Sequence, residues 1–384
     1  RVRFSCRATC SSTRKASVKH PRPTGPLLLT SGMQPGISRA RDFSMPPIDP
    51  RPPAREGDVG RGALPADFAR YGGLELTEAG VVLRYIVSTA EVRERLEASG
   101  APALRLVRHF EISATDRAFH LTLGQLAGGR VSLSAPSDSV TLAERDGEHV
   151  ASIAPSPRAR TFRVTFEFPG ETFTPAAARP ARSVERRWPQ TATAPAKLEH
   201  LSQNGLILDL IAVPEVNPWN RRVRPADLAF LSDDRAAVVT FDGDVWLVSG
   251  FADLQLARLE WRRFASGLHE PLAIAAPGGV IQVATKNGII RLHDRDTNGE
   301  ADGFENFNDQ VIQSQTTRSF PLDMAVAPDG STFVTQGGIV TQSGLPSGGT
   351  GTAHTGAFLR VARDGRALET FARAAYPSMS IDAP

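Results

Sequence analysis

Residues 294–305 carry the most specific chemical signature in the sequence, because oxygen-bearing side chains recur there at alternate positions. The run matches the calcium-loop pattern Asp-x-Asp/Asn-x-Asp/Asn-Gly-x5-Glu at every specified position. Ca²⁺ is a hard cation that takes about six to eight oxygen ligands, which a tightly turned loop can supply. The predicted ligands are Asp294, Asp296, Asn298, Glu300 through its backbone carbonyl, Asp302 directly or through water, and Glu305 with both carboxylate oxygens.

This loop is expected to need its ion. Carboxylates that converge to about 4 Å repel by roughly 4 kcal/mol per pair at an effective dielectric near 20. The apolar run 289–292 before the loop predicts a strand rather than a helix, so the role expected for calcium is stiffening of a strand connection. A solvated acidic turn without an ion is the alternative, since such residues also favour ordinary turns.

The elements that hold this loop belong to a repeated pattern in the second half of the chain. Three segments share it, starting at residues 228, 272 and 324, which are 44 and 52 residues apart. That spacing is typical of a four-stranded propeller blade. Between the middle strands lie Asp242-Gly243, Asn287-Gly288 and Gly337-Gly338, dipeptides that favour type I′ hairpin turns.

A blade buries its faces only against neighbouring blades, and a closed ring removes the free strand edges. Residues 197–384 are therefore predicted to form an incomplete β-propeller, three to four blades of a six-bladed ring. The chain begins at Arg1 rather than Met and stops within the repeated pattern, so we expect a fragment of a longer reading frame. An irregular β-sandwich with coincidental spacing is the alternative to a propeller.

The first half of the chain predicts a different all-β domain. Apolar and polar residues alternate at 80–87, 104–110, 119–123 and 161–168, a pattern of strands with one buried face. We expect an antiparallel β-sandwich over residues 64–173, in which residues 90–99 alone look helical. Residues 1–63 are predicted to be a disordered tail rich in basic residues and proline, and residues 174–196 a linker.

Composition excludes several classes of protein. The net charge of +3 is concentrated in the tail, where the first 41 residues contain no Asp or Glu, so no nucleic-acid partner is expected. The cysteines, Cys6 and Cys10, both lie in this tail and have no role that the sequence reveals; they give no disulfide framework, and the Cys-x-x-Cys-His haem motif is absent. No apolar run approaches the roughly 18 residues of a transmembrane helix, and no signal peptide is visible.

Four segments carry a resemblance to a known family: 217–219, 242–249, 261–268 and 291–302, with Gly-Asp-Val-Trp at 243–246 and the acidic loop as the most specific parts. Over roughly residues 70–384 the chain resembles secreted bacterial proteins that combine a β-sandwich with a six-bladed, TolB-like β-propeller. These are related to soluble quinoprotein glucose and sorbosone dehydrogenases and often carry a cytochrome c domain.

The resemblance implies a periplasmic or extracellular location, calcium, pyrroloquinoline quinone, and electron transfer to a haem in a further domain or to another acceptor. His269 stands before Glu270-Pro271, where the family usually has an apolar residue, so the motif does not make it the base. It is a candidate because imidazole can take a hydroxyl proton near neutral pH. Arg221 and Arg222 are candidates to bind a cofactor carboxylate, with a solvated arginine pair as the alternative.

Two functions follow as hypotheses. The first is a quinoprotein-like dehydrogenase module acting on a sugar or an alcohol. The second is a non-catalytic propeller that binds a glycan or a protein while calcium stiffens its rim. Fold analogy is a weak guide between them, because propellers host many functions.

Overall fold

The computed structural model describes residues 4–5, 27–30, 36–39, 67–100, 103–134, 139–171, 185–198, 209–253, 255–256, 258–311, 320–337 and 354–373. Over these residues the fold is all-β, as predicted, with a single short 3-10 turn at Pro277–Gly279. None of them forms a helix long and apolar enough to cross a membrane. The chain divides into two compact units, Arg1–Tyr71 with Thr77–Ala181 and Gly72–Leu76 with Arg182–Pro384.

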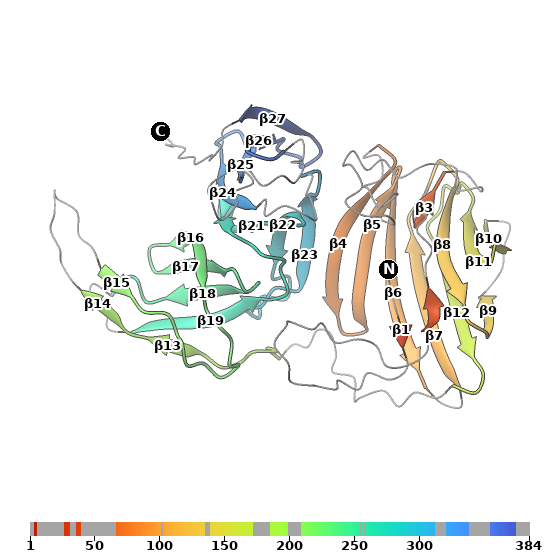
Figure 1. Ribbon diagram of the computed structural model, residues 1–384, viewed down its shortest axis with the longest axis horizontal. Helices are drawn as coiled ribbons and strands as arrows, with labels where there is room; N and C mark the ends of the chain where they lie inside the picture. The colour runs from red at the N-terminus through yellow and green to blue at the C-terminus, as the bar shows by residue number, and fades with distance from the viewer. Residues whose placement is uncertain are drawn as a thin grey trace, which may run out of the picture. The chain divides into compact units, whose positions relative to one another are not determined.

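The first unit is a sandwich of two antiparallel layers (Figure 1). One layer has the order β5-β6-β7-β12-β9, with bounds Gly80–Val87, Ala90–Ser99, Leu104–Ile112, Arg160–Phe168 and Arg130–Leu133. The other has the order β1-β2-β8-β11-β10, with bounds Phe4–Ser5, Leu27–Thr30, Phe119–Leu126, Glu148–Ile153 and Val140–Arg145; β3 (Ile37–Ser38) also pairs with β8. The four runs predicted as strands are all strands.

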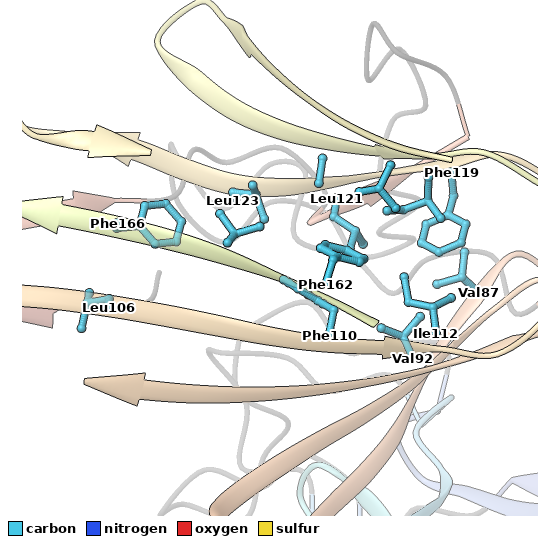
Figure 2. Close-up of a cluster of buried hydrophobic side chains, with 14 of the residues drawn as sticks. Val87, Val92, Leu106, Phe110, Ile112, Phe119, Leu121, Leu123, Phe162 and Phe166 are labelled. Carbon is cyan, nitrogen blue, oxygen red and sulfur yellow. The ribbon is translucent and has the colours of Figure 1, made fainter. Parts of the chain in front are cut away.

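Apolar side chains from alternate positions fill the space between these two layers. Figure 2 shows Leu121 and Leu123 of β8 facing phenylalanines of β7 and β12. Phe110 and Phe162 stack with their ring centroids 4.9 Å apart, and Phe166 is fully buried. Burial of each such side chain stabilises the unit by about 1.5–3 kcal/mol, so the period-two pattern fixes which face of each strand points inward.

The prediction of a helix at residues 90–99 is wrong, because this segment is strand β6 between β5 and β7. Its Ala, Glu, Arg and Leu residues favour helix, but Ala90 and Val92 also alternate with polar positions and are fully buried. Glu94 accepts hydrogen bonds from Arg108 of β7 and from Tyr85 of β5. Cross-strand burial and pairing therefore override the local preference.

Part of the predicted tail also belongs to this sandwich. At Leu27–Thr30 the chain is a strand rather than a disordered tail, pairing with β8 at Leu29↔Leu126. Leu28 and Leu29 are buried in the sandwich core, which explains why this apolar run is ordered. Cys6 and Cys10, like most of residues 1–63, lie outside the described residues.

Within its described residues, the second unit contains three successive four-stranded antiparallel sheets, like propeller blades (Figure 1). The first is β16 (Pro225–Ser232), β17 (Arg235–Thr240), β18 (Val245–Ser249) and β19 (Leu259–Ala265), with β13 (Ala192–Ala194) added at the edge of β19. The second is β20 (Ala273–Ala275), β21 (Ile281–Thr285), β22 (Gly288–His293) and β23 (Gly303–Asn308), with residues 73–75 of β4 (Ala69–Thr77) paired to β23. The third is β24 (Pro321–Val326), β25 (Thr332–Gln336), β26 (Ala357–Val361) and β27 (Leu368–Arg373); β14 (Ala196–Leu198) and β15 (Asp209–Ile211) form a separate pair.

Successive blades pack face to face through their apolar residues. Val239 and Val245 of the first blade share a core with Val283 of the second, and Ile289 of the second shares one with Val334 of the third. The first strands of the blades, β16, β20 and β24, lie next to one another in that order. This is the arrangement expected of propeller blades, because each blade covers one face of the next.

A half-buried carboxylate links two of these first strands. Asp227 of β16 accepts a hydrogen bond from the backbone N–H of Ile274 in β20 at 2.8 Å and another from its neighbour Leu228. Burial raises the pKa of Asp227, and the charge of Asp323 on β24 adds to the rise.

The hairpin turns differ from the type I′ turns predicted. Gly243 and Gly288 have positive φ, but Asp242 and Asn287 do not, so neither dipeptide has the two positive φ values that type I′ requires. In the first blade, residues 241–244 form a longer connection closed by a bond from Gly243 N to Thr240 O. In the third, β25 ends at Gln336 and β26 starts at Ala357, so no two-residue turn joins them; Gly338 lies outside the described residues.

Candidate functional site

The acidic loop connects β22 to β23, and its first half is organised by its own side chains. Asp294 accepts hydrogen bonds from the backbone N–H groups of Asn298 at 3.1 Å and Gly299 at 2.8 Å. Asp296 also accepts from the Asn298 N–H at 3.2 Å, and the Asn298 side-chain oxygen accepts from Glu300 N at 2.8 Å. Three of the predicted ligands therefore gather on the inside of one turn.

The predicted ligands in the second half of the loop have other partners. The Glu300 carboxylate accepts hydrogen bonds from the backbone N–H groups of Arg187 and Trp188. Asp302 accepts from Arg295 N at 3.2 Å, and Glu305, on β23, lies 2.7 Å from His293 Nε2.

The loop fits a divalent cation in part. Asp294, Asp296 and Asn298 offer hard oxygen atoms, which suit Ca²⁺. Burial raises the pKa of Asp294, and the adjacent Asp296 carboxylate adds to the rise because the two negative charges repel. Within the described part of the chain, however, no three His, Cys, Asp or Glu side chains are arranged to hold a metal ion. Glu305 would have to leave His293 to join the first three ligands.

His269 lies in the connection between the first and second blades, exposed and held by the turn that follows β21. Its Nδ1 is 2.9 Å from the Asn287 side-chain oxygen, and its backbone carbonyl accepts a bond from Lys286 N. Because an amide oxygen only accepts hydrogen bonds, Nδ1 carries the proton in this pair. Nε2 is therefore the basic nitrogen of the ring.

Aromatic rings and paired charges lie around this histidine. Glu270, the next residue, accepts a bond from Lys286 Nζ at 3.0 Å. The same ammonium group lies 4.7 Å from the centroid of the Phe320 ring, which packs edge-on against Phe241. Lys286 therefore connects the His269–Glu270 segment to the Phe320 ring.

The 241–244 turn supports this region from the first blade. Gly243 O accepts a hydrogen bond from the backbone N–H of Leu268 at 3.1 Å, so the residue before His269 is tied to the turn. Arg224 donates two hydrogen bonds to Asp242, at 2.9 and 2.6 Å, and these bonds hold the pKa of Asp242 below its usual value.

Of the two arginines proposed to bind a cofactor, Arg221 is engaged within the protein and Arg222 is exposed. Arg221 Nε donates to Asp244 at 2.8 Å, and its terminal nitrogen donates to the Asp242 carbonyl. A cofactor carboxylate would compete with Asp244 for Arg221, so Arg222 fits that role better.

Asp244 and Arg263 form a buried ion pair that sequence reasoning did not identify. Asp244 is 0% exposed and accepts bonds from Arg221, from Arg263 at 3.1 Å and from the Ser266 hydroxyl at 2.6 Å. Burial lowers the pKa of Arg263, and Asp244 opposes that shift. The Gly-Asp-Val-Trp segment was the available signal, but Arg263 lies on another strand, and only the register Trp246↔Arg263 brings the two together.

The four tryptophans pack around this pair rather than line an open surface. The Arg263 guanidinium lies 4.1 Å from the Trp188 ring centroid and 5.6 Å from that of Trp219. Trp246 packs edge-on against both Trp219 and Trp261 and is fully buried. In this geometry the tryptophans are packing residues.

The predicted metal loop and the predicted base are far apart. Asn287, which contacts His269, precedes β22, and Asp294 follows the same strand. At about 3.3 Å per residue, the seven residue steps between them span roughly 20 Å. An ion in the loop would therefore take no part in chemistry at His269.

Comparison with known proteins adds little to this geometry. A family model described as a domain of unknown function (DUF6797) matches residues 6–94, which lie mainly in the first unit. Among curated proteins, none matches the chain. Among solved structures, a candidate oxidoreductase (glucose dehydrogenase) from Thermus thermophilus is similar at 18% identity over 37% of this chain and 44% of that one, with a TM-score of 0.27. The chain thus spans less than half of that structure, and the score is too low to support an argument on fold or reaction.

Proposed function

We propose that the second unit is a propeller-type module of a secreted oxidoreductase that oxidises a hydroxyl group of a sugar or an alcohol, with His269 as the base. The observation that carries this proposal is the 2.9 Å contact between His269 Nδ1 and the Asn287 oxygen on an exposed residue; with Nδ1 as the donor, Nε2 is available to accept a proton. A base must have its lone pair on the atom that faces the substrate.

The proposed reaction balances with a quinone as the oxidant. A bound quinone of the pyrroloquinoline type would supply the two-electron oxidant for the hydride that leaves the carbon bearing the hydroxyl group. His269 Nε2 takes the hydroxyl proton, and the carbon–oxygen bond becomes a carbonyl. Arg222 is the residue we propose to bind a carboxylate of the quinone, since Arg221 is bonded to the buried Asp244. A haem domain or another acceptor would have to reoxidise the reduced quinone.

We also propose that the 294–305 loop binds calcium as a structural ion. The support is the convergence of Asp294, Asp296 and Asn298 through shared backbone hydrogen bonds. Bound Ca²⁺ would neutralise adjacent carboxylates and stiffen the connection between β22 and β23. A calcium-rich compartment such as the periplasm or the extracellular space suits such a site, and this is where we place the protein.

Oxidation of a panel of sugars and alcohols, followed with a redox dye in the presence of pyrroloquinoline quinone and calcium, tests the catalytic proposal. His269→Gln should lower kcat by about a hundredfold to ten-thousandfold, the usual contribution of a general base. His293→Gln, at the far end of β22, is the matched control and should change little.

The catalytic proposal and the calcium proposal are each refuted by a separate measurement. No turnover of any substrate, with or without the quinone, would favour the non-catalytic module that binds a glycan or a protein. Calcium binding is measured separately by titration calorimetry, where Asp294→Asn and Asp296→Asn should weaken it. Equal heats from the chain and from both variants would exclude the loop as the site.

A further inference from the structure

The residues before the first blade form a strap, residues 185–190, that is bound to the acidic loop by Glu300. The Glu300 carboxylate is 7% exposed and accepts two consecutive backbone N–H groups, from Arg187 at 2.8 Å and from Trp188 at 2.6 Å. Arg186 adds a bond from its Nε to the Asn298 carbonyl. A carboxylate that accepts two adjacent amides fixes both the position and the direction of the strap.

The strap in turn covers the buried ion pair of the first blade. Trp188 places its ring 4.1 Å from the Arg263 guanidinium, whose other neighbour is Trp219. Arg263 is 7% exposed, so Trp188 helps to keep water away from its bond with Asp244. A cation between aromatic rings is stabilised most when it is desolvated.

Asp244 connects the strap and Arg263 to the candidate site at His269. It ends the 241–244 turn, and its backbone N–H and carbonyl are both bonded to Thr240. Gly243 in the same turn accepts the Leu268 N–H, and Leu268 precedes His269. A continuous series of bonded groups therefore runs from Glu300 to the backbone beside His269.

We propose that Glu300 is a positioning residue: its carboxylate clamps the 185–190 strap over Arg263 and thereby fixes the Asp244 turn next to His269. The clamp goes beyond the proposed oxidoreductase function and does not depend on it. It also gives Glu300 a role apart from the calcium prediction, in which only its backbone carbonyl takes part.

Amide hydrogen exchange of the full chain, resolved at individual residues, tests the clamp. Glu300→Gln should speed exchange at Arg187 and Trp188 by about tenfold to a hundredfold, because hydrogen bonds to a charged group are lost. Glu305→Gln is the matched control, since that carboxylate faces His293 in the same loop, and it should leave both amides as protected as before. Exchange at Leu268 should also quicken in Glu300→Gln.

A second variant separates the Glu300 clamp from the series of contacts that leads on to Leu268. Trp188→Leu removes the ring over Arg263 but keeps the backbone bonds to Glu300, so Arg187 should stay protected while Leu268 exchanges faster. Unchanged exchange at Arg187 and Trp188 in Glu300→Gln would overturn the clamp. Faster exchange there with Leu268 unchanged in both variants would show that Glu300 holds the strap but positions nothing near His269, which would refute the proposal as stated.

Discussion

Replacing Asp244 with Asn should be the most damaging single change in the second unit. The substitution keeps the shape of the side chain but leaves the buried Arg263 guanidinium without a carboxylate, and Arg221 loses the same partner. Removing one partner of a buried ion pair costs about 3–5 kcal/mol, because the remaining charge stays desolvated. For a unit of about 200 residues this lowers Tm by about 6–20 °C.

Tryptophan fluorescence can follow this loss in one unit alone. All four tryptophans of the chain, Trp188, Trp219, Trp246 and Trp261, lie in the second unit. A thermal melt followed by their emission therefore reports the unit that contains Asp244. Asp242→Asn is the matched control, because Asp242 lies in the same turn but pairs with the exposed Arg224, so its loss should matter far less. If both variants lower Tm equally, the buried pair is not the anchor of this blade and the reasoning fails.

Three further outcomes are expected. Asp227 has a raised pKa when folded, so it contributes stability below its unfolded pKa that is lost as pH rises through the folded one. Asp227→Asn should remove this contribution, so the fluorescence Tm at pH 7 minus that at pH 4 should be larger in the variant than in the original chain. Gly243→Ala should destabilise the second unit by more than Gly267→Ala, because both have positive φ but a Cβ at Gly243 alone would lie 2.4 Å from the Leu268 carbonyl oxygen, which urea unfolding can compare. Phe166→Ala should cost about 3–5 kcal/mol in the sandwich, measured by circular dichroism, and leave the tryptophan-detected melt unchanged.

Much of the fold could be predicted because its strands alternate apolar and polar residues. The pattern at Gly80–Val87 and Arg160–Phe168 follows the burial of alternate side chains. The repeat that begins at Leu228, Leu272 and Met324 predicts the three four-stranded sheets, although Leu228 itself is exposed. The helix prediction for residues 90–99 fails because helix propensity is local to the segment, whereas its structure is decided by pairing with β5 and β7.

The candidate site was harder to predict because its contacts join separate segments. The sequence indicates His269 as a candidate base from its residue type, but it predicts only a turn at Asn287 and not the contact between the two. The 185–190 strap falls within the predicted linker, since no pattern in its sequence indicates that Glu300 binds its backbone. Side chains that bind backbone groups of another segment leave no periodic trace, so spacing alone could not reveal them.

The short strand β13 protects the edge of the first blade from pairing with other chains. It pairs with β19 at Ala192↔Trp261, so the outer rim of the first blade is occupied by chain from upstream. Without β13, β19 would be an edge strand whose unpaired backbone amides and carbonyls could pair with a strand of another chain. The three residues of β13, Ala-Thr-Ala, thus prevent extension of this sheet by strands of other molecules.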